Sequence, residues 1–316
     1  MSLRSVASRA DLLLLLVAAA WGTSYGLAKE AVSLYPVLGF LVIRFGLTTL
    51  FLSGSLILQW RCDATYLFKS GVTTGLILMI IFLCETYGVM HTSASNAAVL
   101  ISLCVVMTPF AEWAILGQAP GARIWFIVVL SLLGVMAISE GFSYRFSLGD
   151  GLILCAAVMR ALMVTLTSKL TRNYNGSSAA LTAVQSLVVT AGCGLLVIVL
   201  IPDKIIDVPV SPRFWAIMFY LVVVCTVLAF FVQNYAVRRV SPTRVSVLMG
   251  SEPLFGVLFA VYWLGESLTP RGMLGMGLIV IAGLLMVLTR NVREKAADND
   301  LPHERVESFS QEKMVS

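Results

Sequence analysis

Ten runs of apolar residues, each about as long as one membrane crossing, constrain this chain more than any other feature. A helix needs about 20 apolar residues to cross a hydrocarbon layer of roughly 30 Å. Backbone groups in lipid must be satisfied within their own segment, so runs of this length predict helices. The predicted spans are residues 12–28, 37–58, 71–90, 97–117, 124–140, 151–168, 179–201, 214–236, 245–264 and 273–289.

The composition agrees with a membrane protein, because 59% of the residues are hydrophobic and only 12% are charged. A soluble domain carries roughly 25% charged residues. The net charge of +5 comes from basic residues scattered through loops, so no patch suited to nucleic acid is expected. The six cysteines show no paired spacing, and we expect no metal site and no cofactor. The sequence therefore predicts an all-α integral membrane protein.

The distribution of Lys and Arg predicts the orientation of the spans. With the N-terminus inside, thirteen Lys and Arg residues up to Lys295 lie in inside segments and five in outside loops. Because inside loops are enriched in these residues, we expect both termini to be cytoplasmic. Residues 1–11 are predicted to be a short cytoplasmic tail. Residues 290–316 are charged and poor in apolar residues, so a disordered cytoplasmic tail is expected there.

The two halves of the chain, residues 12–140 and 150–289, resemble each other. The matching segments, at offsets of 139 and 148 residues, are Arg9-Ala10-Asp11 with Leu148-Gly149-Asp150, Tyr87-Gly88-Val89 with Tyr235-Ala236-Val237, and Leu116-Gly117-Gln118 with Leu264-Gly265-Glu266. Each half holds five spans, and an odd number inserts the second half upside down. Inverted repeats are typical of secondary transporters, whose substrate site lies near the midplane.

Several short motifs resemble one transporter family. They are Ala20-Trp21-Gly22, Ile43-Arg44-Phe45, Thr92-Ser93-Ala94-Ser95-Asn96-Ala97, Gln233-Asn234-Tyr235-Ala236, Ser241-Pro242-Thr243 and Glu252-Pro253-Leu254. In this order and spacing the chain resembles the drug/metabolite transporter (DMT) superfamily, in its EamA-like branch. The resemblance implies ten transmembrane helices as two inverted five-helix repeats, and export or exchange of small organic molecules. The sequence departs from the family pattern at Gln118, where the family has glutamate.

Two arginines fall inside predicted spans, where a charged side chain costs roughly 2.5–3.5 kcal/mol on insertion scales. Arg44 could bind a substrate carboxylate, or it could pair with a helix C-terminus or a glutamate. Arg160 occupies the position that corresponds to Trp21 in the first half. A substrate contact and an internal pairing are both open for Arg160.

Two glutamates inside the spans could couple transport to protons or form ion pairs. Glu85 could exchange a proton, or it could form a salt bridge to Arg44 or Arg160. Its counterpart in the second half is Gln233, which keeps the shape without the charge. Glu252 could line a cavity, sit at a hinge, or pair with an arginine such as Arg244.

Two prolines and a third glutamate complete the polar features of the spans. Proline removes a backbone donor and disturbs the preceding turn of a helix, so Pro109 and Pro253 are predicted hinges. Glu112 follows Pro109 and is interpreted as interfacial.

Aromatic and amide side chains form two further stripes. Trp21 and Tyr25 are four residues apart and share one helix face. Thr226, Phe230 and Gln233 share another, and either stripe could line a pore or pack against neighbouring helices. The predicted substrate-binding or pore residues are Trp21, Tyr25, Arg44, Arg160, Gln185, Thr226, Phe230 and Gln233.

The leading functional hypothesis is a secondary transporter that works by alternating access. The favoured substrate is an amino acid or a similar small zwitterion or anion, exported or exchanged, with coupling to protons or a counter-substrate. We expect a bacterial inner membrane protein whose partners are the substrate and the bilayer, and no nucleic acid. The alternatives are an intramembrane enzyme, whose usual His-Glu-x-x-His and Gly-x-Ser-x-Gly motifs are missing, and a channel or sensory scaffold.

Overall fold

A computed structural model describes residues 3–92, 94–138, 147–171, 176–200, 208–264 and 270–289, and these ranges contain helices and short connections but no strand. In chain order the helices are α1 (Leu3–Leu34), α2 (Val37–Phe51), α3 (Ser53–His91), α4 (Ala94–Ile101), α5 (Cys104–Leu116), α6 (Ala122–Ile138), α7 (Leu148–Thr171), α8 (Ser178–Leu200), α9 (Pro212–Val222), the π-helical η2 (Val223–Leu228), α10 (Ala229–Val237), α11 (Pro242–Met249), α12 (Glu252–Leu264) and α13 (Pro270–Leu288).

Most of these helices are suited to a bilayer. Seven segments of the described chain are long and apolar enough to cross a membrane, namely Arg9–Leu34, Ala64–His91, Ala97–Leu116, Leu148–Thr171, Ser178–Leu200, Pro212–Val237 and Pro270–Leu288. Helix α2 and the start of α3, bent by 57°, make an eighth if they are taken as one span. Helix α6 is apolar but shorter. The all-helical expectation is confirmed for the described ranges, and the count of ten spans stays a prediction.

Two segments expected to be non-helical are helical. Residues 59–70, predicted as a loop, lie within the continuous helix α3. This stretch contains neither glycine nor proline, so nothing in it stops a helix. Residues 3–11, predicted as a tail, form the first turns of α1. The predicted tail at 290–316 lies outside the described residues.

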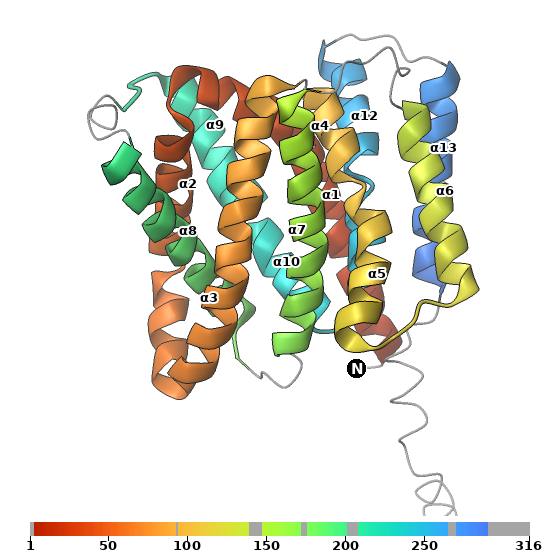
Figure 1. The fold of residues 1–316 in the computed structure, drawn as a ribbon, viewed down its shortest axis with the longest axis horizontal. Coiled ribbons are helices and arrows are strands. Elements are labelled where there is room, and N and C mark those ends of the chain that lie inside the picture. The colour runs from red at the N-terminus through yellow and green to blue at the C-terminus, as the bar shows by residue number, and fades with distance from the viewer. Residues whose placement is uncertain are drawn as a thin grey trace, which may run out of the picture.

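Helices from the two halves of the chain pack against each other. Helix α3 lies along α7, α2 along α8, α6 along α13, and α1 along both α10 and α12. Figure 1 shows α2 and α8 at one edge of the bundle and α6 and α13 at the opposite edge. Glycines allow some of these close approaches: a Cβ atom on Gly149 of α7 would lie 2.7 Å from the Gly88 carbonyl oxygen of α3.

Two predicted spans, one in each half of the chain, are each broken into two shorter helices at corresponding positions. Ser102 and Leu103 separate α4 from α5, and Gly250 and Ser251 separate α11 from α12, 148 residues later in the chain. Helix α4 packs against α12, and α5 packs against α11. Pro109 lies inside α5 and Pro253 is the second residue of α12, so each interruption precedes its proline. The hinge role of the two prolines stays a prediction.

The beginning of α1 and the end of α13 lie at the same end of the bundle, because both bond to Arg244. Its Nε and Nη2 donate to the two oxygens of Asp11 at 2.8 and 2.6 Å. Its Nη1 and Nη2 also donate to the carbonyl oxygens of Thr289 and Val287. Asp11 and Arg244 are buried, so this ion pair ties α1, α11 and α13 together.

Glu112 is buried beside this end of the bundle, and its interfacial position stays a prediction. Its Oε2 accepts hydrogen bonds from the backbone N and the Oγ1 of Thr243, at 3.0 and 2.5 Å. A carboxylate that accepts from a helix N-terminus is well placed electrostatically, since Thr243 belongs to the first turn of α11.

Candidate substrate site between the two halves

A buried ionic cluster joins three helices in the centre of the bundle. Arg160 of α7 lies between two carboxylates: its Nη1 is 2.8 Å from Oε1 of Glu252, and its Nη2 is 3.5 Å from Oε2 of Glu85. The side chains of Arg160, Glu252 and Glu85 are only 10%, 2% and 13% exposed. An isolated charge at such a depth is very costly, and these pairings reduce that cost. The cluster therefore holds α3, α7 and α12 together.

Helix α1 adds two aromatic side chains to the cluster. Tyr25 Oη donates to Oε2 of Glu252 at 2.8 Å, and the guanidinium carbon of Arg160 lies 4.5 Å from the Trp21 ring centroid. The indole Nε1 of Trp21 donates to the Cys225 carbonyl at 2.8 Å. Cation–π contact with a tryptophan face is favourable when the cation is desolvated. One face of α1 thus meets the cluster, as the spacing of Trp21 and Tyr25 allows.

Gly22 of α1 brings this face close to α12. A Cβ atom on Gly22 would lie 2.6 Å from the Glu252 carbonyl oxygen and 2.9 Å from the Gly256 backbone nitrogen. Any larger residue would push α1 away from α12, so the hydrogen bond from Tyr25 to Glu252 depends on this glycine.

Arg44 of α2, which is also buried, lies beside neutral side chains. Its guanidinium carbon lies 4.8 Å from the Phe82 ring centroid and 5.8 Å from that of Phe45. Its Nε donates to Thr226 Oγ1 at 2.9 Å, and Thr226 donates to the Leu221 carbonyl five residues earlier, within the wide π-helical turn. In the described part of the chain no carboxylate lies within 4 Å of Arg44 and its terminal nitrogens donate to no residue.

A row of four aromatic rings connects the two arginines. Ring centroids are 5.3 Å apart for Trp21 and Phe230, 5.9 Å for Phe230 and Phe82, and 4.6 Å for Phe82 and Phe45. Arg160 stacks on the first ring and Arg44 lies over the third. The row crosses from α1 through α10 to α3 and α2, and so it bridges the two halves.

The two glutamines differ in their surroundings. Gln185 is fully buried, donates to Thr74 Oγ1 at 2.8 Å and accepts from Asn234 Nδ2 at 2.9 Å. This network ties α8 to α3 and α10 and is separate from both arginines. Gln233 is also buried, but its Oε1 accepts no hydrogen bond in the described part of the chain.

The structure thus separates the predicted site residues into groups. The ionic cluster contains Trp21, Tyr25, Glu85, Arg160 and Glu252, and the Arg44 group contains Arg44, Thr226, Phe230 and the unpredicted rings Phe45 and Phe82. Arg244, considered above as a partner of Glu252, pairs with Asp11 instead. Phenylalanines within apolar runs carry no signal that distinguishes them from packing residues.

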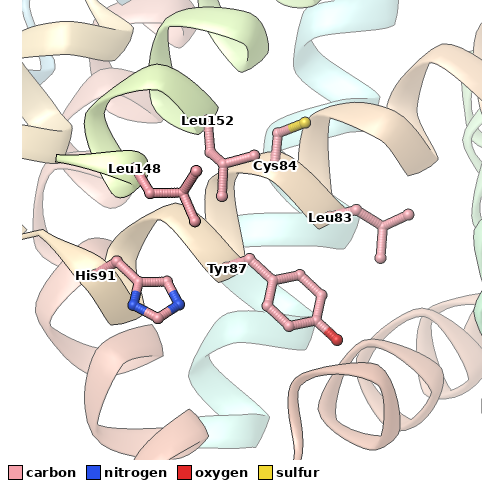
Figure 2. A pocket seen from close by; sticks show the side chains of 6 residues that line it. All are labelled: Leu83, Cys84, Tyr87, His91, Leu148 and Leu152. Atoms are coloured by element: carbon pink, nitrogen blue, oxygen red, sulfur yellow. The ribbon is translucent and has the colours of Figure 1, made fainter. Parts of the chain in front are cut away.

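Two surface hollows lie away from these groups. One, of about 220 Å³, lies between the end of α3 and the start of α7 (Figure 2) and is lined by Leu83, Cys84, Tyr87, His91, Leu148 and Leu152. Leu148 is 74% exposed, so this hollow opens on the outer face of the bundle. The other, of about 70 Å³, lies beside Glu112 and Arg244 at the end where α1 begins.

Comparison with known proteins identifies the family of the chain. The sequence model of the EamA-like transporter family matches the chain twice, over residues 8–140 and 147–289. An uncharacterized transporter of Archaeoglobus fulgidus is 27% identical over 279 residues, which cover 88% of this chain and 86% of that protein. A probable terminal-alkyne amino-acid exporter of Streptantibioticus cattleyicolor is 26% identical over 213 residues, covering 65% and 68%.

The fold is also found in an experimental structure. One crystal structure superposes with a TM-score of 0.69 at 16% sequence identity, over 89% of this chain and 97% of that one. Together with the apolar helices, the two family matches show that the chain is an integral membrane protein and belongs to the EamA-like transporter family of the drug/metabolite transporter superfamily.

Proposed function

We propose that the protein is a secondary transporter with ten transmembrane helices in two inverted repeats, residues 12–140 and 150–289. The repeats rock against each other and expose a central site to either side of the membrane in turn. Both chain ends lie on the cytoplasmic side, and a bacterial inner membrane is the expected location. The observation that carries the proposal is the buried ionic cluster of Arg160, Glu85 and Glu252, which draws its members from both halves.

The pairing of helices supports the inverted repeats. If spans one to five correspond to spans six to ten, α1 corresponds to α7, and α3 corresponds to the α9–η2–α10 segment. A two-fold axis in the membrane plane then relates the α3–α7 contact to the contact of α10 with α1. The contacts α2–α8 and α6–α13 each map onto themselves. Residues at corresponding positions then meet across the axis. Arg160 stacks on Trp21, at the offset of 139 residues, and Phe82 contacts Phe230, at the offset of 148.

An amino acid or a similar small zwitterion or anion is the proposed substrate. Two buried arginines in an aromatic setting suit a carboxylate-bearing molecule, and one relative is named an amino-acid exporter. Glu85 and Glu252 share one cation, so the cluster carries one negative charge more than Arg160 balances when both are ionised. Proton exchange at this cluster is the proposed source of coupling, with counter-substrate exchange as the other source.

Transport in proteoliposomes tests this proposal. Vesicles loaded with a mixture of labelled amino acids are assayed for efflux with and without a pH gradient, for the wild type, Arg160→Ala and Glu85→Gln. We expect selective movement of one compound class, loss of transport in Arg160→Ala, and loss of the gradient response in Glu85→Gln. If the folded and inserted wild type moves no amino acid under any gradient, this substrate proposal is wrong.

A further inference from the structure

Arg44 has hydrogen-bond donors that no residue in the described part of the chain accepts from. Its side chain is buried, and among the described residues only Thr226 accepts from it, through Nε. The two terminal nitrogens, with four N–H bonds between them, donate to no described residue. A guanidinium edge of this shape matches a carboxylate, which can accept two parallel hydrogen bonds from it. The Phe82 and Phe45 rings hold the guanidinium in place without neutralising it.

One oxygen of Glu85 is ion-paired but accepts no hydrogen bond in the described part of the chain. Its Oε2 is buried and lies 3.5 Å from Arg160, yet it accepts no hydrogen bond from any described residue. A buried carboxylate oxygen without a donor is costly to maintain, so such an atom favours a ligand that supplies one. Tyr25, by contrast, donates to Glu252, whose two oxygens are both occupied.

Arg44 and Glu85 lie on the same side of the contact between Phe82 and Phe230. Glu85 follows Phe82 by one turn of α3, and Thr226 precedes Phe230 by about one turn. Helix α3 and the α9–η2–α10 segment run in opposite directions (Figure 1), so Glu85 and Thr226 fall at a similar level. Arg44 is bonded to Thr226, so its guanidinium lies at this level as well.

We propose that Arg44 and Glu85 form the binding site of a zwitterion, with the substrate carboxylate on Arg44 and its ammonium group on Glu85. The pair is complementary to an α-amino acid, in which the two charged groups are close neighbours. Arg160, Glu252 and Tyr25 hold Glu85 in position from α7, α12 and α1. This assignment rests on the proposed transport function and specifies how the substrate is recognised.

Competition by substrate analogues tests the assignment on the wild-type protein. Uptake of a mixture of labelled L-amino acids is measured against an excess of the unlabelled amino acids, of their amides, which lack the carboxylate, and of their N-acetyl derivatives, which lack the ammonium group. We expect the parent amino acids to compete at least about tenfold better than either derivative, because each derivative loses a charge-assisted hydrogen bond.

Variants then assign each group to its partner. In Arg44→Gln we expect the amides to compete for uptake as well as the parent amino acids do. Arg44→Lys should restore part of the difference. In Glu85→Gln the advantage over the N-acetyl derivatives disappears. Arg123→Gln, which removes an exposed arginine at the start of α6, serves as the matched control and keeps the wild-type profile.

The outcomes separate this assignment from the proposed function. Transport of amino acids with equally good competition by the amides and N-acetyl derivatives would overturn the assignment and leave the transporter intact. The assignment would also be overturned if Arg44→Gln and Glu85→Gln both still favoured the parent amino acids over their derivatives as the wild type does. Absence of amino-acid transport in the folded wild type would instead contradict the proposed amino-acid substrate, on which this assignment rests. The wild-type competition decides the question even if Arg44→Gln does not fold.

Discussion

Individual buried charges in this protein are stabilised by partners from distant parts of the sequence, and their removal should be costly. Asp11→Asn leaves the Arg244 cation buried without its counter-ion, and we expect a loss of roughly 3 kcal/mol in the free energy of unfolding. Thermal denaturation in detergent measures this loss. Arg213→Gln is the control, because Arg213 pairs with Glu30 but its side chain is 76% exposed, so about 0–1 kcal/mol is expected. Equal destabilisation by the two changes would contradict the argument from burial.

Helix crossings set the spacing between elements, and glycines make the closest of them possible. In Gly149→Ala the added Cβ atom would meet the Gly88 carbonyl oxygen at 2.7 Å and the His91 backbone at 2.8 Å, so α3 and α7 must separate. We expect a destabilisation of about 1–3 kcal/mol, measured as a lower midpoint of unfolding. Gly283→Ala in α13 is the matched control, since its Cβ atom would meet nothing within 4 Å. Similar effects of the two alanines would show that the α3–α7 spacing is not limiting.

The whole molecule must open alternately at its two ends if the proposed mechanism is right, and the crossing of α5 with α11 should take part. Thr108 and Ser246 are hydrogen-bonded across this crossing, with 2.7 Å between their hydroxyl oxygens. A disulfide formed in the double variant Thr108→Cys and Ser246→Cys, in a background without other cysteines, should reduce transport to the level of empty vesicles. Reduction should restore transport, and each single variant should be insensitive to oxidant. Full transport by the cross-linked protein would exclude separation of α5 from α11.

The sequence predicts the helices of this protein better than it predicts the contacts between them. The apolar runs predict the helical architecture, and the four-residue spacing of Trp21 and Tyr25 predicts a shared face. The run lengths carry no information about which helices become neighbours. The pairings of Arg160 with Glu252 and of Arg244 with Asp11, 92 and 233 residues apart, therefore could not be predicted. The continuity of α3 was missed because charged residues at 59–70 resemble a loop.

The contact of Arg160 with Trp21 carries a consequence for the ancestry of the chain. Positions next to a two-fold axis face their own counterparts, so in a dimer of two identical half-length chains an arginine here would lie against another arginine. Two buried cations at that distance would repel strongly. The present combination of a cation over an indole ring requires different residues at the two positions. If the proposed inverted repeat arose by joining two copies of one gene, the joining would have let the two positions diverge and so allowed a single charge at the axis.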